Sequence, residues 1–153
     1  VITCLDPRVD PAAVLGLELG DAPVIRNAGG RVTEAVLRDI AFISYMGEKM
    51  AADGPLFEVA VIHHTQCGTG ALANEEFRHE FAHRTGYSED SLSRQAVLEP
   101  ERTVRADVQA ILSAPQVSDR ITVSGHVYDL DSGLVRTIIA PTAPHADRAG
   151  SLA

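Results

Sequence analysis

The chain has 153 residues, of which 45% are hydrophobic and 22% charged, proportions that fit one globular domain and exclude collagen-like, coiled-coil and disordered chains. Its 13 Lys and Arg against 21 Asp and Glu give a formal net charge of −8, which disfavours nucleic acid and anionic membranes as partners. Every apolar stretch is far shorter than the ~20 residues of a membrane helix. We therefore expect one soluble domain over residues 1–140 and a C-terminal tail over residues 141–153.

The first part of the chain predicts two strands separated by a short helix. Residues 1–5 have the composition of a short β-strand. Pro11 suits the first position of a helix, which should stop near Gly20. A second strand is expected over residues 22–26, at an edge of the sheet because Pro23 cannot donate a ladder hydrogen bond.

A longer helix and a buried strand follow. Thr33 is a suitable N-cap, apolar residues at helical spacing continue to about Met46, and Gly47 suits the helix end. Residues 57–63 form a nearly continuous apolar run, which is typical of a strand covered on both faces. We therefore place this strand in the centre of a parallel sheet.

The second half of the chain predicts two more helices and a strand pair. A helical stretch follows Gly70, a polar connection covers residues 85–100, and a further helix covers residues 102–112. The sequence predicts two strands joined by a hairpin turn, over residues 121–128 and 134–139. Because strands and helices alternate, we predict an α/β fold: a mostly parallel central sheet of four strands plus an antiparallel edge strand, flanked by helices.

The only two cysteines of the chain, Cys4 and Cys67, lie where predicted parallel strands end. Open α/β sheets build their sites at this edge. Two thiolates and one imidazole suit zinc, because three protein ligands leave a fourth position for water or substrate. His63 and His64 should point to opposite faces of a strand, so only one can join Cys67. We choose His64, whose spacing to Cys67 is that of a turn-sized chelate.

A carboxylate and a guanidinium stand beside the predicted metal ligands. On an extended segment Asp6 and Arg8 would point the same way as Cys4. Arg8 could then hold the Asp6 carboxylate away from the metal and in position to accept a proton from bound water. The plainer alternatives are a surface ion pair and two cysteines that serve as small buried hydrophobes. The conjunction of all these residues at two strand ends favours the metal site.

Two other motifs lack the residues that their chemistry requires. Gly68-Thr69-Gly70 is not followed by the lysine of a phosphate-binding loop. Ser124 lacks the preceding glycine of a nucleophile elbow. Neither a nucleotide-binding protein nor a serine hydrolase is therefore expected.

In the order and spacing of Cys4-x-Asp6-x-Arg8 and His64-x-x-Cys67-Gly68, the sequence resembles the β-class carbonic anhydrases. The likeness continues through Arg26-Asn27-Ala28-Gly29 and extends to about residue 138. The resemblance implies a zinc ion held by Cys4, His64 and Cys67, with the Asp6–Arg8 dyad beside it and the Gly68 backbone shaping a substrate pocket.

The resemblance also implies an activity and an assembly. Zinc-bound hydroxide would attack carbon dioxide to give bicarbonate, the reaction of a carbonate dehydratase, which is a zinc lyase. The protein would form a homodimer or a higher homo-oligomer, with active sites near the subunit interface. The family's N-terminal arm is expected to be missing from this sequence, which begins at Val1.

Two alternatives to carbonic anhydrase activity stay open. Relatives with the same ligands hydrolyse carbonyl sulfide or carbon disulfide, and the motifs do not separate these linear, apolar substrates. A catalytically silent zinc-binding homologue is the other alternative. Pro7 stands where the family usually has a small residue. With only two cysteines we expect reduced thiols and a cytoplasmic location.

Overall fold

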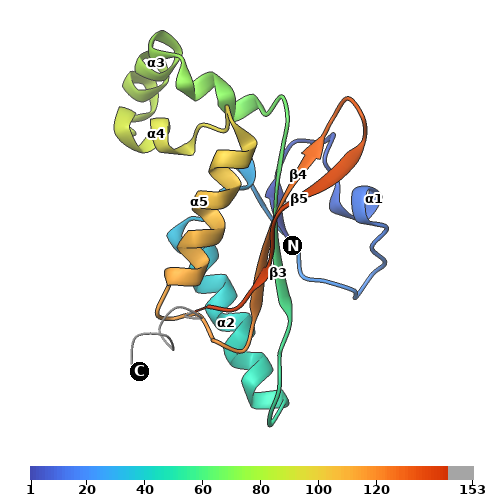
Figure 1. The fold of residues 1–153 in the computed structure, drawn as a ribbon. Coiled ribbons are helices and arrows are strands. Elements are labelled where there is room, and N and C mark those ends of the chain that lie inside the picture. Colours follow the sequence, from blue (N-terminus) through green and yellow to red (C-terminus); the bar gives the residue numbers. More distant parts are fainter. Residues whose placement is uncertain (145–153) are drawn as a thin grey trace, which may run out of the picture.

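The computed structural model describes residues 1–144, which form an α/β fold around one five-stranded sheet in the order β2-β1-β3-β4-β5 (Figure 1). The first four strands in this order run parallel, and β5 pairs with β4 in the antiparallel direction. The predicted fold class is confirmed, with β3 central and β2 at an edge. The strands are β1 (Ile2–Cys4), β2 (Ile25–Asn27), β3 (Glu58–His64), β4 (Thr122–Asp129) and β5 (Leu134–Thr142).

Helices α2 and α5 lie against one face of the sheet (Figure 1). The core between them and the sheet includes Val104, Val108 and Ile111 of α5, all fully buried, together with Val61 and Val123 from the strands. The helices are α1 (Pro11–Leu15), α2 (Glu34–Met50), α3 (Glu75–Thr85), α4 (Glu89–Gln95) and α5 (Pro100–Ser113), with short 3₁₀ segments η1 (Ala28–Gly30) and η2 (Gly68–Ala73).

Two helices end at other residues than predicted, because the glycines expected to end them do not do so. α1 ends at Leu15, earlier than predicted, because Gly16 takes a left-handed conformation with φ of 68°. Thr33 caps α2 as predicted, since its hydroxyl accepts a hydrogen bond from the Val36 N–H. Gly47 does not end this helix, which continues to Met50. Gly47 instead faces the Leu56 side chain, which a Cβ at this position would meet at 3.4 Å.

Helix α4 lies inside the stretch that was predicted to be a polar connection. Its N-cap Ser88 accepts a hydrogen bond from the Ser91 N–H, and Leu92 is its only buried residue. A short helix with one buried side chain shows no apolar periodicity, so the pattern of the sequence could not reveal it. At the other end of the chain, β5 continues to Thr142, and residues 145–153 of the predicted tail lie outside the described part.

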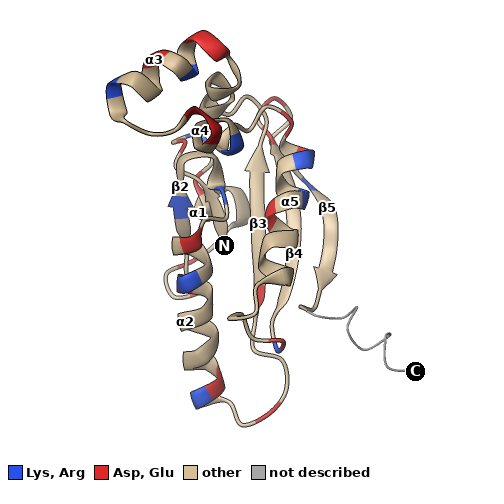
Figure 2. Cartoon of the chain, turned by 90° about the vertical axis from the view of Figure 1, so that its left-hand side faces the viewer, with Lys and Arg blue, Asp and Glu red and all other residues tan. Residues whose placement is uncertain are grey.

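Charged residues of both signs are interspersed along the chain, and α3 and α4 lie beyond the end of the sheet to which β3 points (Figure 2). Between residues 1 and 144, no helix combines the length and the apolar composition needed to cross a membrane.

Gly30 lies where η1 passes directly over the backbone of β1. A Cβ at this position would lie 2.8 Å from the Cys4 nitrogen, and the backbone has a φ of +65°. We expect Gly30→Ala to lower the free energy of unfolding by about 2–4 kcal/mol, the sum of left-handed strain and a steric clash. Urea denaturation measures this loss.

Gly133 offers a matched control for this prediction. Its φ is +70°, yet a Cβ there would meet nothing within 4 Å. Gly133→Ala should therefore cost only about 1 kcal/mol, the strain alone. Equal losses for the two variants would show that the close approach to β1 has no energetic importance.

Candidate metal centre

The carboxyl ends of β1 and β3 bring together the three residues predicted to bind a metal. Cys4 is the last residue of β1, His64 is the last residue of the neighbouring parallel strand β3, and Cys67 follows in the next loop. One ligand atom from each residue lies within 4.8 Å of the others, and all three residues are buried. The two Sγ atoms are 3.9 Å apart.

His64 presents an unpaired nitrogen to the two sulfurs. Its Nδ1 lies 2.8 Å from the Thr65 carbonyl oxygen, which can only accept, so Nδ1 carries the proton and Nε2 holds a lone pair. This Nε2 is buried and has no hydrogen-bond partner in residues 1–144. A buried polar atom without a partner costs free energy, and a metal ion would satisfy it.

The donor set fits zinc. Two sulfurs bound to a tetrahedral zinc ion at ~2.3 Å are about 3.8 Å apart, close to the observed 3.9 Å. Two sulfurs and one imidazole are donors that zinc prefers, and three protein ligands are the pattern of an open catalytic site. In the described part of the chain the group has no fourth member.

The two thiols differ in acidity because they hydrogen-bond to each other. The hydrogen bond from Cys4, helped by Thr69, lowers the pKa of Cys67 to about 6. The same contact with Cys67, together with burial, raises the pKa of Cys4 to about 11. Burial opposes a charge on His64, but the neighbouring Cys4 thiol and the hydrogen bond to the Thr65 carbonyl outweigh it and raise the pKa of this imidazole. Without a metal the sulfur pair therefore keeps one proton at neutral pH.

Asp6 and Arg8 form a tightly bonded pair in a turn after β1. The segment is not extended as predicted, because the strand ends at Cys4 and the Val9 N–H donates to the Asp6 carbonyl at 3.1 Å. Arg8 donates from its backbone N–H and Nε to Asp6 Oδ1 at 2.9 and 3.0 Å, and from Nη2 to Oδ2 at 2.8 Å. These hydrogen bonds hold the pKa of Asp6 well below its usual range. The carboxylate is therefore ionised and fixed by Arg8.

Gln66 anchors this pair to the loop between His64 and Cys67. Its carbonyl accepts a hydrogen bond from Arg8 Nη2 at 3.2 Å, and its side-chain amide donates to Asp131 Oδ1 at 2.9 Å. Gln66 has a φ of 55°, the left-handed region that non-glycine residues rarely occupy. Strained residues of this kind gather at functional sites. Gln66 was not predicted as a site residue, and no sequence pattern marks it.

Arg26 holds the backbone of the same segment and was also missed as a site residue. Its Nε donates to the Cys4 carbonyl at 3.0 Å and its Nη2 to the Asp6 carbonyl at 2.7 Å. An ion pair with Asp10 at 3.3 Å completes its contacts. The register Thr3 opposite Arg26 places it beside β1. Strand adjacency could have suggested this position, but not the direction of the side chain.

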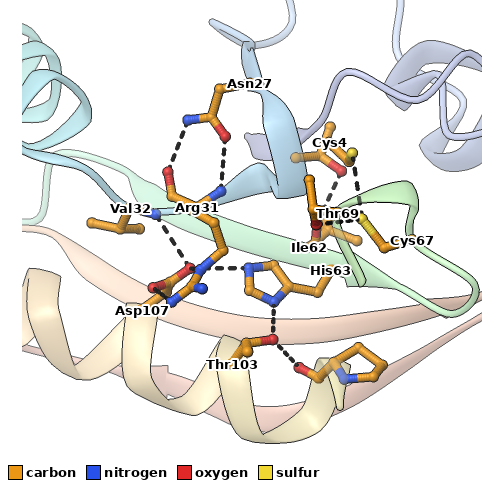
Figure 3. Close-up of polar contacts among 12 residues, drawn as sticks. Cys4, Asn27, Arg31, Val32, Ile62, His63, Cys67, Thr69, Thr103 and Asp107 are labelled. Carbon is orange, nitrogen blue, oxygen red and sulfur yellow. Dashed lines mark hydrogen bonds and ion pairs between the residues drawn. The ribbon is translucent and has the colours of Figure 1, made fainter. Parts of the chain in front are cut away.

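A buried polar network lies on the opposite side of β3 from Cys4 and Cys67 (Figure 3). His63 points away from the sulfurs, as predicted, with Nε2 3.1 Å from Asp107 Oδ2 and Nδ1 2.7 Å from the Thr103 hydroxyl. Arg31 binds Asp107 through Nε at 2.7 Å and Nη2 at 2.9 Å. Asn27 bonds the Arg31 backbone on both sides at 2.8 Å. The network joins the residues on either side of η1 to β3 and α5.

Gly68 opens η2 immediately after Cys67. A Cβ at this position would meet no atom within 4 Å. Its contribution to a substrate pocket stays a prediction.

Comparison with known proteins identifies the family. Residues 1–135 match the carbonic anhydrase family. The chain is 28% identical over 139 residues to β-carbonic anhydrase 1 of Mycobacterium tuberculosis, covering 90% of this chain and 80% of that protein. The crystal structure of a carbonic anhydrase from Streptococcus mutans shares 34% identity with a TM-score of 0.72, covering 90% of this chain and 78% of that one.

A second kind of relative has a different activity. A carbon disulfide hydrolase of Acidianus is 26% identical over 160 residues, covering 89% of this chain and 74% of that protein. The fold, the order of the motifs and the match over residues 1–135 place the chain in the β-carbonic anhydrase family.

Proposed function

We propose that the protein is a zinc enzyme that reversibly hydrates carbon dioxide to bicarbonate, with Cys4, His64 and Cys67 as the zinc ligands. The observation that carries this proposal is the buried, unpaired Nε2 of His64 beside two sulfurs 3.9 Å apart. The donor types and spacing suit zinc with one open position. Membership of the carbonic anhydrase family supports the reaction.

Each residue around the metal ligands has a distinct task. Zinc, when bound, supplies Lewis-acid activation of water. Asp6 is ionised and accepts a proton, while three hydrogen bonds from Arg8 keep its oxygens from the metal ligands. The Gln66 carbonyl fixes Arg8, and Arg26 fixes the carbonyls of the Cys4–Asp6 segment. Gly68 is expected to shape the substrate pocket.

The second candidate function is hydrolysis of carbon disulfide or carbonyl sulfide at the same site. The relatedness to a carbon disulfide hydrolase favours this candidate specifically. Like carbon dioxide, these substrates are linear and apolar and have an electrophilic carbon. A catalytically silent zinc protein is the third candidate. The restrained Asp6 carboxylate argues against a silent zinc protein, because a purely structural metal does not need a proton acceptor beside it.

Parallel assays on one zinc-loaded preparation separate these candidates. We expect stopped-flow mixing with carbon dioxide to show hydration, while hydrogen sulfide release from carbon disulfide and carbonyl sulfide stays at background. The same protein stripped of metal is the control and should be inactive. Hydrogen sulfide release without hydration would establish the hydrolase instead, and zinc-replete protein without any turnover would establish the silent homologue.

We also propose that the working unit is a homodimer or a higher homo-oligomer in the cytoplasm. Helix α2 leaves Phe42, Tyr45 and Met50 exposed at 64%, 56% and 84%, apolar surface that a second subunit can cover. A β-carbonic anhydrase from Sordaria macrospora, 19% identical, is described as tetrameric. Both cysteines are free thiols, which suits a reducing compartment. The net charge of −8 supports small-molecule substrates rather than nucleic acid.

A further inference from the structure

The Thr69 hydroxyl contacts one of the two sulfurs of the metal centre. Thr69 is the second residue of η2, and its Oγ1 lies 3.1 Å from Cys67 Sγ (Figure 3). The other side-chain partner of this sulfur is Cys4 Sγ. A thiolate bound to a metal carries no proton and can only accept. With both sulfurs on a metal, the Thr69 hydroxyl is the one side-chain donor left to Cys67 in the described structure.

Gly29 of η1 lies beside this hydroxyl and leaves space for it. A Cβ on Gly29 of η1 would lie 3.0 Å from Thr69 Oγ1 and 3.1 Å from Val97 Cγ2, tighter than ordinary contacts. Gly29 has a φ of +80°, so the backbone conformation itself favours glycine. Val97 is almost fully buried. Thr69 is half-buried, and a side chain at position 29 would press on the hydroxyl that contacts Cys67.

We infer that Thr69 is a positioning residue that tunes the metal through Cys67. Its hydrogen bond withdraws negative charge from the sulfur, so the sulfur donates less charge to zinc, and zinc polarises water more strongly. This inference rests on the proposed zinc site. Substitution of a residue that hydrogen-bonds to a metal ligand typically changes metal affinity or activity by about 10–100-fold.

Three substitutions test the role of the hydroxyl. Thr69→Val keeps the shape of the side chain and removes the hydroxyl donor. Thr69→Ala also removes the hydroxyl and leaves a smaller side chain, whereas Thr69→Ser keeps the hydroxyl. In cobalt-substituted protein, we expect the thiolate-to-cobalt charge-transfer band to move to lower energy in the Val and Ala variants, because their sulfur is richer in electrons. The Ser variant should keep the wild-type band.

Metal retention and turnover give the second and third measurements. Competition with a chelator should show zinc binding no weaker in Thr69→Val, because its sulfur donates more charge to the metal, whereas carbon dioxide hydration should lose about 10-fold in kcat and recover in Thr69→Ser. An unshifted band in the Val and Ala variants, or a Ser variant that behaves like them, would overturn the inference. The cobalt spectrum and the chelator competition need no turnover, so they decide the role of Thr69 even if the proposed reaction is wrong.

Discussion

Replacing Cys67 with serine is expected to remove bound zinc and carbon dioxide hydration together. The substitution leaves two ligands and exchanges a thiolate for a neutral hydroxyl, which binds zinc poorly. Without the metal the pKa of the attacking water rises to that of bulk water, so kcat/KM should fall below about 1% of the wild-type value. Metal analysis after dialysis and stopped-flow hydration measure the two losses.

Asp6→Asn is the matched control for this prediction. Asp6 lies outside the group of three candidate metal ligands, and both of its oxygens are bonded to Arg8. This variant should keep its zinc while kcat falls by about 10²–10⁴, the usual loss when a proton acceptor is removed. Full carbon dioxide hydration by Cys67→Ser would show that Cys67 is not a required zinc ligand. Loss of zinc from Asp6→Asn would show that Asp6 helps to bind the metal and does not serve only as a proton acceptor.

Asp107→Asn is expected to cause the largest loss of stability. The Asp107 side chain is 5% exposed and neutralises Arg31, whose own side chain is 14% exposed. Removing one charge leaves the other buried and unpaired, which costs about 3–5 kcal/mol. The double substitution Arg31→Met with Asp107→Leu should cost less than Asp107→Asn alone, because no unpaired charge remains. Urea denaturation gives the free energies of unfolding.

The same residue predicts how stability depends on pH. Burial raises the pKa of Asp107, but hydrogen bonds from His63 and Arg31 outweigh this and lower the pKa in the folded protein. A lowered carboxyl pKa stabilises the fold above the unfolded value of about 3.9, and this stabilisation is lost as the pH falls toward the folded value. The stability of Asp107→Asn should therefore change less with pH in that acid range.

Asp90→Asn serves as the control for both measurements. Asp90 pairs with Arg94 on the surface of α4, where its side chain is 79% exposed. Its loss should cost under about 1 kcal/mol. If Asp107→Asn costs no more than Asp90→Asn, the buried network does not stabilise the fold as argued.

The sheet could be predicted because its strands carry strong local signals. The apolar run that became β3 is buried on both faces, and the Asp-rich turn before β5 marked the hairpin. Helix ends were harder to predict, because Gly47 packs against Leu56 inside α2 rather than ending it. The choice between these two uses of glycine depends on a contact between residues of different elements, which periodicity does not contain.

The residues grouped at the metal centre could be predicted for a topological reason. Parallel neighbouring strands end at the same edge, so Cys4 and His64 had to lie close once β1 and β3 were adjacent. The residues that support them could not be found in this way. Arg26 acts on backbone carbonyls, and Arg31 meets Asp107 across two elements far apart in sequence. Such contacts depend on side-chain directions that only the folded structure determines.

We propose that hydration of carbon dioxide by this protein depends on one zinc ion held by Cys4, His64 and Cys67. The most direct test is the initial rate of hydration measured against zinc bound per chain as metal-free protein is titrated. We predict a rate that rises linearly and levels off at one zinc per chain. A protein that binds one zinc per chain without hydrating carbon dioxide, or that hydrates it equally well without zinc, would contradict this proposal.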